Sequence, residues 1–124
     1  MYNIRELDVY NMSLDFSNLI WEICIKWEPF AKNTIAYQLV RSTDSISANI
    51  AEGFGRFHYK ENLKFCFYAR GSLEETQGWL RKAYKRKLIS SDKREKIESF
   101  LSIFPQKFNT YINKIKQYKN QDSE

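Results

Sequence analysis

Groups capable of acid–base, nucleophilic or metal chemistry are few in this 124-residue chain. His58 is the single histidine, and Cys24 and Cys66 are the two cysteines. A zinc site usually takes four ligands, often in closely spaced pairs, so these residues form none and the cysteines are expected as reduced core thiols. The glycines of residues 53–55 follow an expected helix and lack the third glycine of a dinucleotide-binding loop. The sequence therefore predicts no catalytic residue, no metal, no cofactor and no enzymatic activity.

A cluster of cations offers a second chemistry, the binding of phosphates. Residues 59–124 carry fifteen Lys and Arg against eight Asp and Glu, whereas residues 1–58 carry five against seven. Within residues 81–96 the counts are eight against two. The candidate phosphate contacts are Arg81, Lys82, Lys85, Arg86, Lys87, Lys93 and Arg94. Two interpretations stay open, a solvated helix end favoured by the helix dipole and a patch that faces nucleic acid. The neighbouring Trp79 and Tyr84 either pack or stack on bases.

Apolar residues recur at spacings of three and four along most of the chain, which is the pattern of amphipathic helices. Trp21 in the first helix and Phe67 in the third are expected on the inner faces. The predicted elements are helices at about residues 4–27, 34–55, 59–87 and 91–118, then a frayed polar tail at 119–124. Because the connections are short, we predict an all-α, antiparallel, up-and-down four-helix bundle that forms one domain over residues 1–118.

Several residues mark the expected helix ends. Residues 3–6 have the form of a capping box, and Pro29 disfavours helix at the residue before it. Asn33 is a suitable cap for the second helix, and the pair Ser90 and Ser91 can cap the fourth. Pro105 lies inside the fourth helix, so we expect a kink or a split there.

Small and polar residues occupy two stretches where helix faces should pack, residues 41–56 and 69–75. A glycine inside a helix costs about 1 kcal/mol, so its presence indicates close packing against a neighbour. Polar side chains at helical spacing share a face in each stretch: Arg41, Asn49, Glu52 and Arg56 in the first, Arg70 and Glu74 in the second. Two interpretations are open, a charge network that spans a helix pair or subunit interface, and a ligand site.

These stretches resemble a known signature. SISANIAEG at residues 45–53 with Gly55 and Arg56, followed by ARGSLEE at residues 69–75, is similar to the bacterial four-helix-bundle proteins encoded by intervening sequences in 23S ribosomal RNA genes. The accessory variability proteins of diversity-generating retroelements are similar. The resemblance covers about residues 7–112. It implies residues that hold helices or subunits together: Arg41, Asn49, Glu52, Gly53, Arg56, Arg70, Gly71, Ser72 and Glu75.

The resemblance also implies a function. Members of this family assemble as homopentamers and are commonly basic, without known catalysis, and the retroelement relatives bind nucleic acid and a reverse transcriptase. With a net charge of +5, we expect a non-catalytic homopentamer that binds RNA or DNA through phosphates, without sequence readout. The alternative is a scaffold that recruits a protein such as a reverse transcriptase or a ribosome-associated factor. Since the chain shows neither a signal peptide nor a membrane-spanning apolar run, we expect a cytoplasmic protein with no membrane partner.

Overall fold

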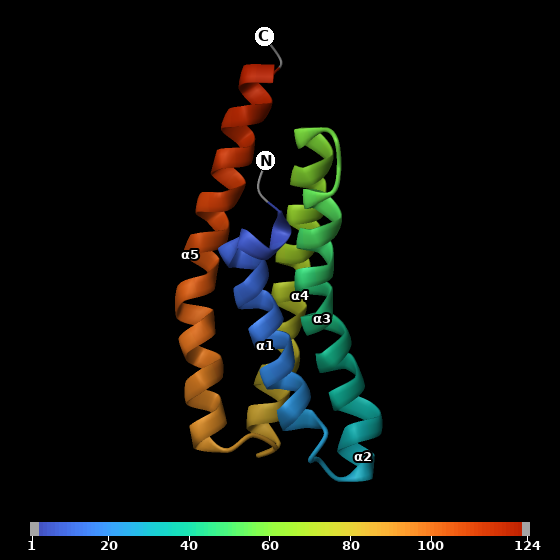
Figure 1. Ribbon diagram of the computed structural model, residues 1–124. Coiled ribbons are helices and arrows are strands. Elements are labelled where there is room, and N and C mark those ends of the chain that lie inside the picture. The colour runs from blue at the N-terminus through green and yellow to red at the C-terminus, as the bar shows by residue number, and fades with distance from the viewer. Residues whose placement is uncertain (1–2, 123–124) are drawn as a thin grey trace.

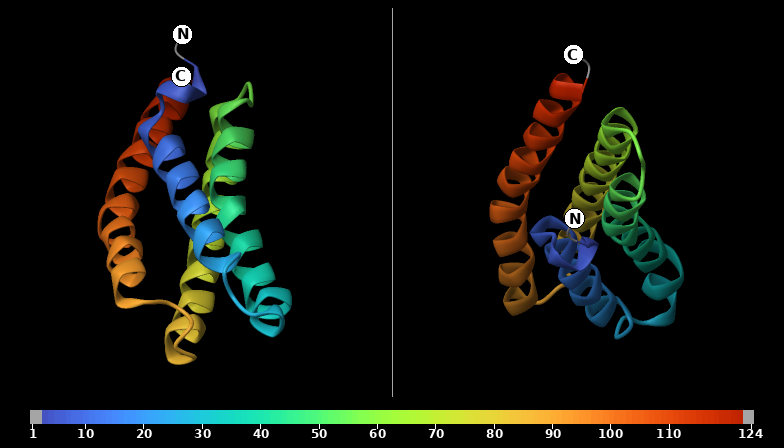
Figure 2. Two further views of the ribbon diagram at one scale, coloured as in Figure 1. Left: turned by 60° about the horizontal axis from the view of Figure 1, so that its bottom comes forward. Right: turned by 45° about the horizontal axis from the view of Figure 1, so that its top comes forward.

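The computed structural model describes residues 3–122, and this part of the chain contains helices and no strand. The long helices are α1 (Asp8–Cys24), α3 (Tyr37–Phe54), α4 (Tyr59–Lys85) and α5 (Ser91–Asp122). The short ones are the 3-10 helix η1 (Ile4–Glu6), α2 (Pro29–Ala31) and the π-helix η2 (Lys32–Ala36). Consecutive long helices run in opposite directions, side by side (Figures 1 and 2). The prediction of an all-helical bundle is confirmed. Within the described residues, no helix is long and apolar enough to cross a membrane.

The predicted capping box is present, but it caps a short helix. The Asn3 Oδ1 atom accepts a hydrogen bond from the Arg5 amide at 2.8 Å, and Glu6 Oε2 accepts one from the Asn3 amide at 3.1 Å. Leu7 then has an extended backbone, with φ −87° and ψ 113°, which ends η1 after Glu6. The first predicted helix is therefore divided, and α1 begins only at Asp8.

Pro29, rather than Asn33, begins the second helical stretch. The residue before Pro29 has an extended backbone, as expected before a proline. Pro29 itself occupies the first helical turn, where its missing N–H leaves no helical hydrogen bond unmade. Helix α2 continues through η2 into α3, so Asn33 lies inside the π-helix. The prediction of Asn33 as a helix cap is wrong.

Helix α5 is continuous through Pro105, so the expected split is absent from Ser91–Asp122. A stack of aromatic rings holds this helix to α1: the centroids of Phe16 and Phe100 are 3.9 Å apart, and those of Phe100 and Phe104 are 4.8 Å apart. The stack continues to Phe108 at 5.3 Å, and both Phe104 and Phe108 are buried. Burying one Phe contributes about 1.5–3 kcal/mol, so the stack offsets the roughly 3 kcal/mol cost of an interior proline.

The last helix extends into the residues expected as a frayed polar tail, 119–124. Helix α5 continues through residues 119–122, beyond the end predicted at residue 118. Residues 123–124 lie outside the described residues. In Figure 1 the C-terminal part of α5 extends past the ends of the other long helices.

Two aromatic residues expected on inner faces lie outside the core. Trp21 of α1 is 55% exposed and Phe67 of α4 is 44% exposed. In both helices the neighbouring positions take the inner face instead, since Ile20 and Cys66 are fully buried. One residue corresponds to 100° of rotation around a helix, so an apolar residue next to a core position points to the flank.

Helices α3 and α4 approach closely at Gly53. A Cβ atom at this position would lie 2.6 Å from Asn62 Oδ1, 2.9 Å from Phe65 Cβ and 3.0 Å from the Asn62 carbonyl oxygen. Further along the helix pair, the Thr76 hydroxyl donates a hydrogen bond to the Ser42 hydroxyl at 3.0 Å, and both side chains are buried. Small side chains thus set the spacing of these two helices.

We predict that Gly53→Ala lowers the free energy of unfolding by about 1–3 kcal/mol, because the added methyl group forces α3 and α4 apart. Gly55→Ala is the matched control, since its Cβ would meet no atom closer than 3.6 Å. Urea denaturation followed by circular dichroism measures both. Equal stability of the two variants would show that Gly53 does not set the helix spacing.

Candidate nucleic-acid interface

The seven predicted phosphate contacts lie at one end of the bundle, which we call the basic end. Helix α4 ends there and α5 begins there, at the lower end of the molecule in Figure 1. Lys93 is half-buried and the other six side chains are exposed: Arg81, Lys82, Lys85, Arg86, Lys87 and Arg94. Two helices therefore contribute cations to one surface.

A tight turn joins the two helices. The Lys87 amide donates to the Tyr84 carbonyl at 3.0 Å, and the Leu88 amide donates to the Ala83 carbonyl at 3.0 Å. This is the Schellman pattern, and Lys87 adopts the left-handed conformation that it requires, with φ 60°. Helix α4 therefore ends at Lys85, two residues before its predicted end. As predicted, Ser90 caps α5, because its Oγ atom accepts from the Lys93 amide at 3.3 Å.

The helix dipole explains the position of only some of the cations at the basic end. Cations at the C-terminus of α4 are favoured by its dipole, but Lys93 and Arg94 lie near the N-terminus of α5, where the dipole disfavours them. The Arg94 Nε atom lies 4.0 Å from Glu98 Oε1. Within residues 3–122, no other of the seven cations has a carboxylate within 4.0 Å. The basic end is therefore largely uncompensated positive charge.

The two aromatic rings beside the basic end are covered by its own cations. The Lys82 Nζ atom lies 4.3 Å from the centre of the Trp79 ring, and the Arg94 guanidinium lies 4.0 Å from that of Tyr84. The indole N–H of Trp79 also donates to Glu75 Oε2 at 3.1 Å. Burial, together with the negative charge of Glu98, raises the pKa of Tyr84 to about 12. These rings pack, and their covered faces offer no platform for bases.

The motif residues that resemble the family signature connect helices. Arg41 of α3 forms an ion pair with Glu75 of α4 and also donates to Gln38 Oε1 at 3.2 Å. Arg70 of α4 donates to Asn109 Oδ1 of α5 at 2.5 Å. The first pair is about half exposed, so its contribution to stability is at most about 1 kcal/mol. These two separate contacts connect α3 to α4 and α4 to α5 within one chain.

The remaining motif residues divide between local contacts and open surface. Glu52 of α3 pairs at 2.6 Å with Arg56, which follows the end of that helix, and the Arg56 guanidinium lies 4.8 Å from the centre of the Phe65 ring of α4. Asn49 donates to the Ser45 carbonyl of its own helix. The Ser72 carbonyl accepts from the Thr76 hydroxyl, whereas an added Cβ at Gly71 would meet no atom within 4 Å. Gly53 and Gly71 therefore have different surroundings in the chain.

Comparison with protein-family models decides the relationship. The model of the 23S rRNA-intervening sequence protein family matches residues 5–110. The chain belongs to this family. The match to the 23S rRNA-intervening sequence proteins includes the seven cations of the basic end, both motif stretches and most of the bundle. A search among curated proteins found no significant match.

Side chains with metal-binding or nucleophilic chemistry do not converge in this family member. Within residues 3–122, no group of three or more His, Cys, Asp and Glu residues is placed to hold a metal ion. Cys24 and Cys66 are buried and unpaired, and burial raises the pKa of each thiol to about 12. Both side chains are therefore protonated, unreactive thiols at neutral pH.

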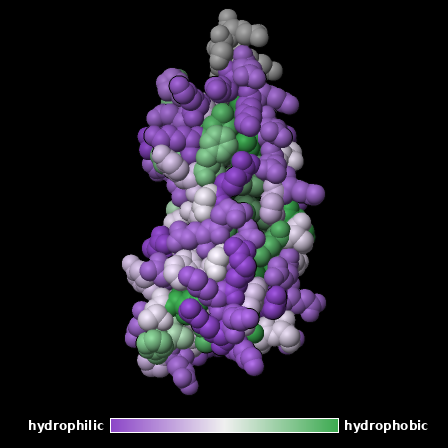
Figure 3. All heavy atoms as spheres, turned by 180° about the vertical axis from the view of Figure 1, so that it is seen from behind, coloured by the Kyte–Doolittle hydropathy of each residue, from purple (hydrophilic) through white to green (hydrophobic). Residues whose placement is uncertain are grey.

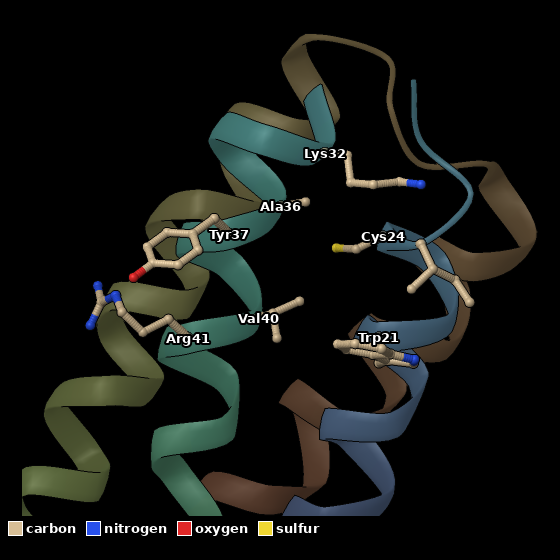
Figure 4. Close-up of a pocket in the computed structure, with 8 residues that line it drawn as sticks. Trp21, Cys24, Lys32, Ala36, Tyr37, Val40 and Arg41 are labelled. Carbon is tan, nitrogen blue, oxygen red and sulfur yellow. The ribbon is translucent and has the colours of Figure 1, made fainter. Parts of the chain in front are cut away.

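An apolar groove between α1 and α3 was not predicted from the sequence. It has a volume of about 320 Å³. Figure 4 shows Trp21 and Cys24 of α1 facing Ala36 and Val40 across it, with Lys32 reaching over one end. The signal in the sequence was Trp21, an aromatic residue at the flank of the helical stripe. Its partners across the groove belong to the next helical stretch, at residues 32–41, so only the folded chain shows which faces meet.

We predict that Lys87→Gly raises the free energy of unfolding by about 0.5–1 kcal/mol, since a non-glycine residue in the left-handed region carries strain. Lys85→Gly is the control with the same loss of charge, and it should lower stability by a similar amount because residue 85 is helical. Thermal and urea denaturation provide the comparison. Destabilisation by both substitutions would show that Lys87 is not strained.

Proposed function

We propose that this protein is a non-catalytic nucleic-acid-binding protein whose basic end contacts RNA or DNA phosphates. The observation that supports the proposal is the gathering of seven cations from α4, α5 and the turn between them at one end of the bundle, with a single carboxylate, Glu98, within 4.0 Å of any of them among the described side chains. Such uncompensated charge repels itself in the free protein and is relieved by an anionic partner. Binding releases the counterions condensed on the nucleic acid, so affinity falls steeply as salt rises.

The proposed contacts carry no sequence information. Phosphate contacts position a protein on nucleic acid, whereas base edges specify the sequence. The cations of the basic end surround a turn rather than one face of a helix that could enter a groove, and Trp79 and Tyr84 are covered. We therefore assign the basic end to binding without sequence readout.

We also propose that the chain assembles as a homopentamer, which the resemblance to pentameric bundles implies. The exposed face of α4 supports a contact between subunits there. Added Cβ atoms at Gly71 and Gly78 would meet nothing within 4 Å, so neither glycine is required by a contact with described residues. Each costs about 1 kcal/mol in a helix, and close packing of a second chain would account for it. Five basic ends would bind one strand with avidity.

The groove between α1 and α3 favours a second candidate function, a scaffold that recruits a protein partner. Trp21, Ile25 and Tyr37 border this groove and are 55%, 44% and 64% exposed. Exposed apolar groups gathered in one place are typical of surfaces that bind other proteins. In this function, the basic end would meet an acidic surface of the partner, such as a reverse transcriptase or a ribosome-associated factor.

Charge reversal at the basic end tests the first function. We predict that Lys82, Lys85, Arg86 and Lys87 changed together to Glu abolish salt-sensitive binding to labelled RNA and DNA in fluorescence anisotropy. Variants that lack a single cation still bind, so the slope of log affinity against log salt concentration can be measured for them. Removal of one phosphate-binding cation should reduce this slope by about 0.7–0.9.

The matched control moves the same charge elsewhere on the surface. Lys85→Glu with Arg86→Glu is compared with Lys107→Glu and Lys114→Glu, which lie further along α5 and are also exposed. Both double variants change the net charge equally, so a difference between them reports the position of the charge. Equal weakening by the two would contradict a site at the basic end, and binding by none of the proteins would favour the scaffold function.

The assembly has its own measurement. Light scattering is predicted to give a mass of about 75 kDa, five times the 14.9 kDa of one chain. Gly71→Leu should reduce this mass, because a large side chain on the open face of α4 blocks a second chain while favouring the helix. If the unaltered protein has the mass of one chain, the proposed pentamer is wrong, and so is the avidity that depends on it.

A further inference from the structure

A second groove lies between the N-terminal half of α4 and the C-terminal end of α5, which we call the aromatic groove. It has a volume of about 580 Å³ and an almost entirely apolar floor. Its lining residues are Lys60, Glu61, Leu63, Lys64, Phe67, Tyr68 and Lys119. Figure 3, which views the molecule from behind, shows hydrophobic atoms flanked by hydrophilic ones in its upper part. The basic end lies at the opposite end of α4.

The rings of the aromatic groove remain open to solvent. Phe67 and Tyr68 are 44% and 49% exposed. Cations lie over these rings at longer distances, with the Arg70 guanidinium at 5.6 Å from the centre of Phe67 and Lys64 Nζ at 5.9 Å from that of Tyr68, and Tyr68 also meets the Phe65 ring edge-on. The rings at the basic end have cations at 4.0–4.3 Å. The groove therefore holds aromatic surface on which a planar group can stack, which the basic end lacks.

Lysines surround this aromatic surface. Lys60 and Lys64 of α4 belong to the lining. The Lys116 Nζ atom of α5 is not part of the lining but lies over the Phe67 ring, 6.0 Å from its centre. Glu61 is the one carboxylate in the lining. None of these three lysines has a carboxylate within 4.0 Å among the side chains that the structure describes, those of residues 3–120. The rim is thus positive and the floor is aromatic.

We propose that the aromatic groove binds single-stranded nucleic acid, with bases stacked on Phe67 and Tyr68 and phosphates held by Lys60, Lys64 and Lys116. Open rings inside a positive groove are how proteins bind single strands without sequence preference, because every base has a flat face. A duplex cannot use this site, since its bases are already stacked on one another. This site goes beyond the phosphate contacts of the basic end and does not depend on them.

Position and shape distinguish this occupant from two others. The second copy of the chain that the proposed homopentamer places at Gly71 and Gly78 packs further along α4 than the groove lining at residues 60–68. A lipid surface is bound by apolar side chains that project from the protein, whereas these rings line a hollow between two helices. A single strand presents both groups that the groove complements, flat bases and anionic phosphates.

The test is fluorescence anisotropy with labelled oligothymidylate, with a strand of the same length built of abasic sites, and with a duplex. Phe67→Ala with Tyr68→Ala should weaken binding of oligothymidylate at least about fivefold and leave binding of the abasic strand and the duplex unchanged. Phe67→Trp should retain the affinity, because it keeps a stacking surface. Ile103→Ala, which removes another exposed apolar side chain of α5, is the control and should have no effect.

The outcomes separate this site from the basic end. Charge reversal at Lys85 and Arg86 should weaken all three probes but preserve the difference between oligothymidylate and the abasic strand. Equal weakening of all probes in the alanine variant, with an unchanged circular dichroism spectrum, would overturn the proposal. So would equal affinity of the unaltered protein for oligothymidylate and the abasic strand. A changed mass in light scattering would assign the groove to a subunit contact, and a selective loss of binding to phosphatidylserine vesicles would assign it to a lipid surface.

Discussion

The packing of this bundle depends on the absence of a side chain at Gly53. The Asn62 carbonyl and side chain of α4 occupy the space where a Cβ atom would stand. Because the helices meet there, the chain can reverse over residues 55–58 and return along α3. The same approach places Thr76 against Ser42 in the interior, where each hydroxyl needs a partner. The surface pair of Arg41 and Glu75 follows from this register and adds little to stability.

Helix α5 is held by a different interaction. Stacked rings from Phe16 to Phe108 attach it to α1, and they tolerate Pro105 because the side chains before and after the proline keep their places in the core. Small residues therefore order the α3–α4 pair, whereas large aromatic residues fix α5. Because these rings attach α5 to α1, the aromatic groove remains between α5 and the N-terminal half of α4.

The sequence predicted most of the fold because helical periodicity and end signals are local. It failed where two local signals competed, as when Pro29 began the helix before Asn33 could cap it. It also placed Trp21 and Phe67 inside, because apolar type alone does not distinguish a core position from its neighbour. The basic end was found because its cations are close in sequence. Both grooves were missed, since each depends on how side chains of two different helices meet.

The ring contacts at the basic end have a further physical consequence. Long cationic side chains normally sample many rotamers, and immobilising one costs about 0.5–1.5 kcal/mol on binding. Lys82 lies over Trp79 and Arg94 over Tyr84 before any anion arrives, so part of this entropy is already given up in the free protein. The two side chains are preorganised, and the others on this surface, such as Lys85 and Arg86, retain their freedom to adapt to the irregular positions of phosphates. Lys82 and Arg94 therefore give a bound strand a fixed point of contact, and the other cations adjust to phosphates at different positions.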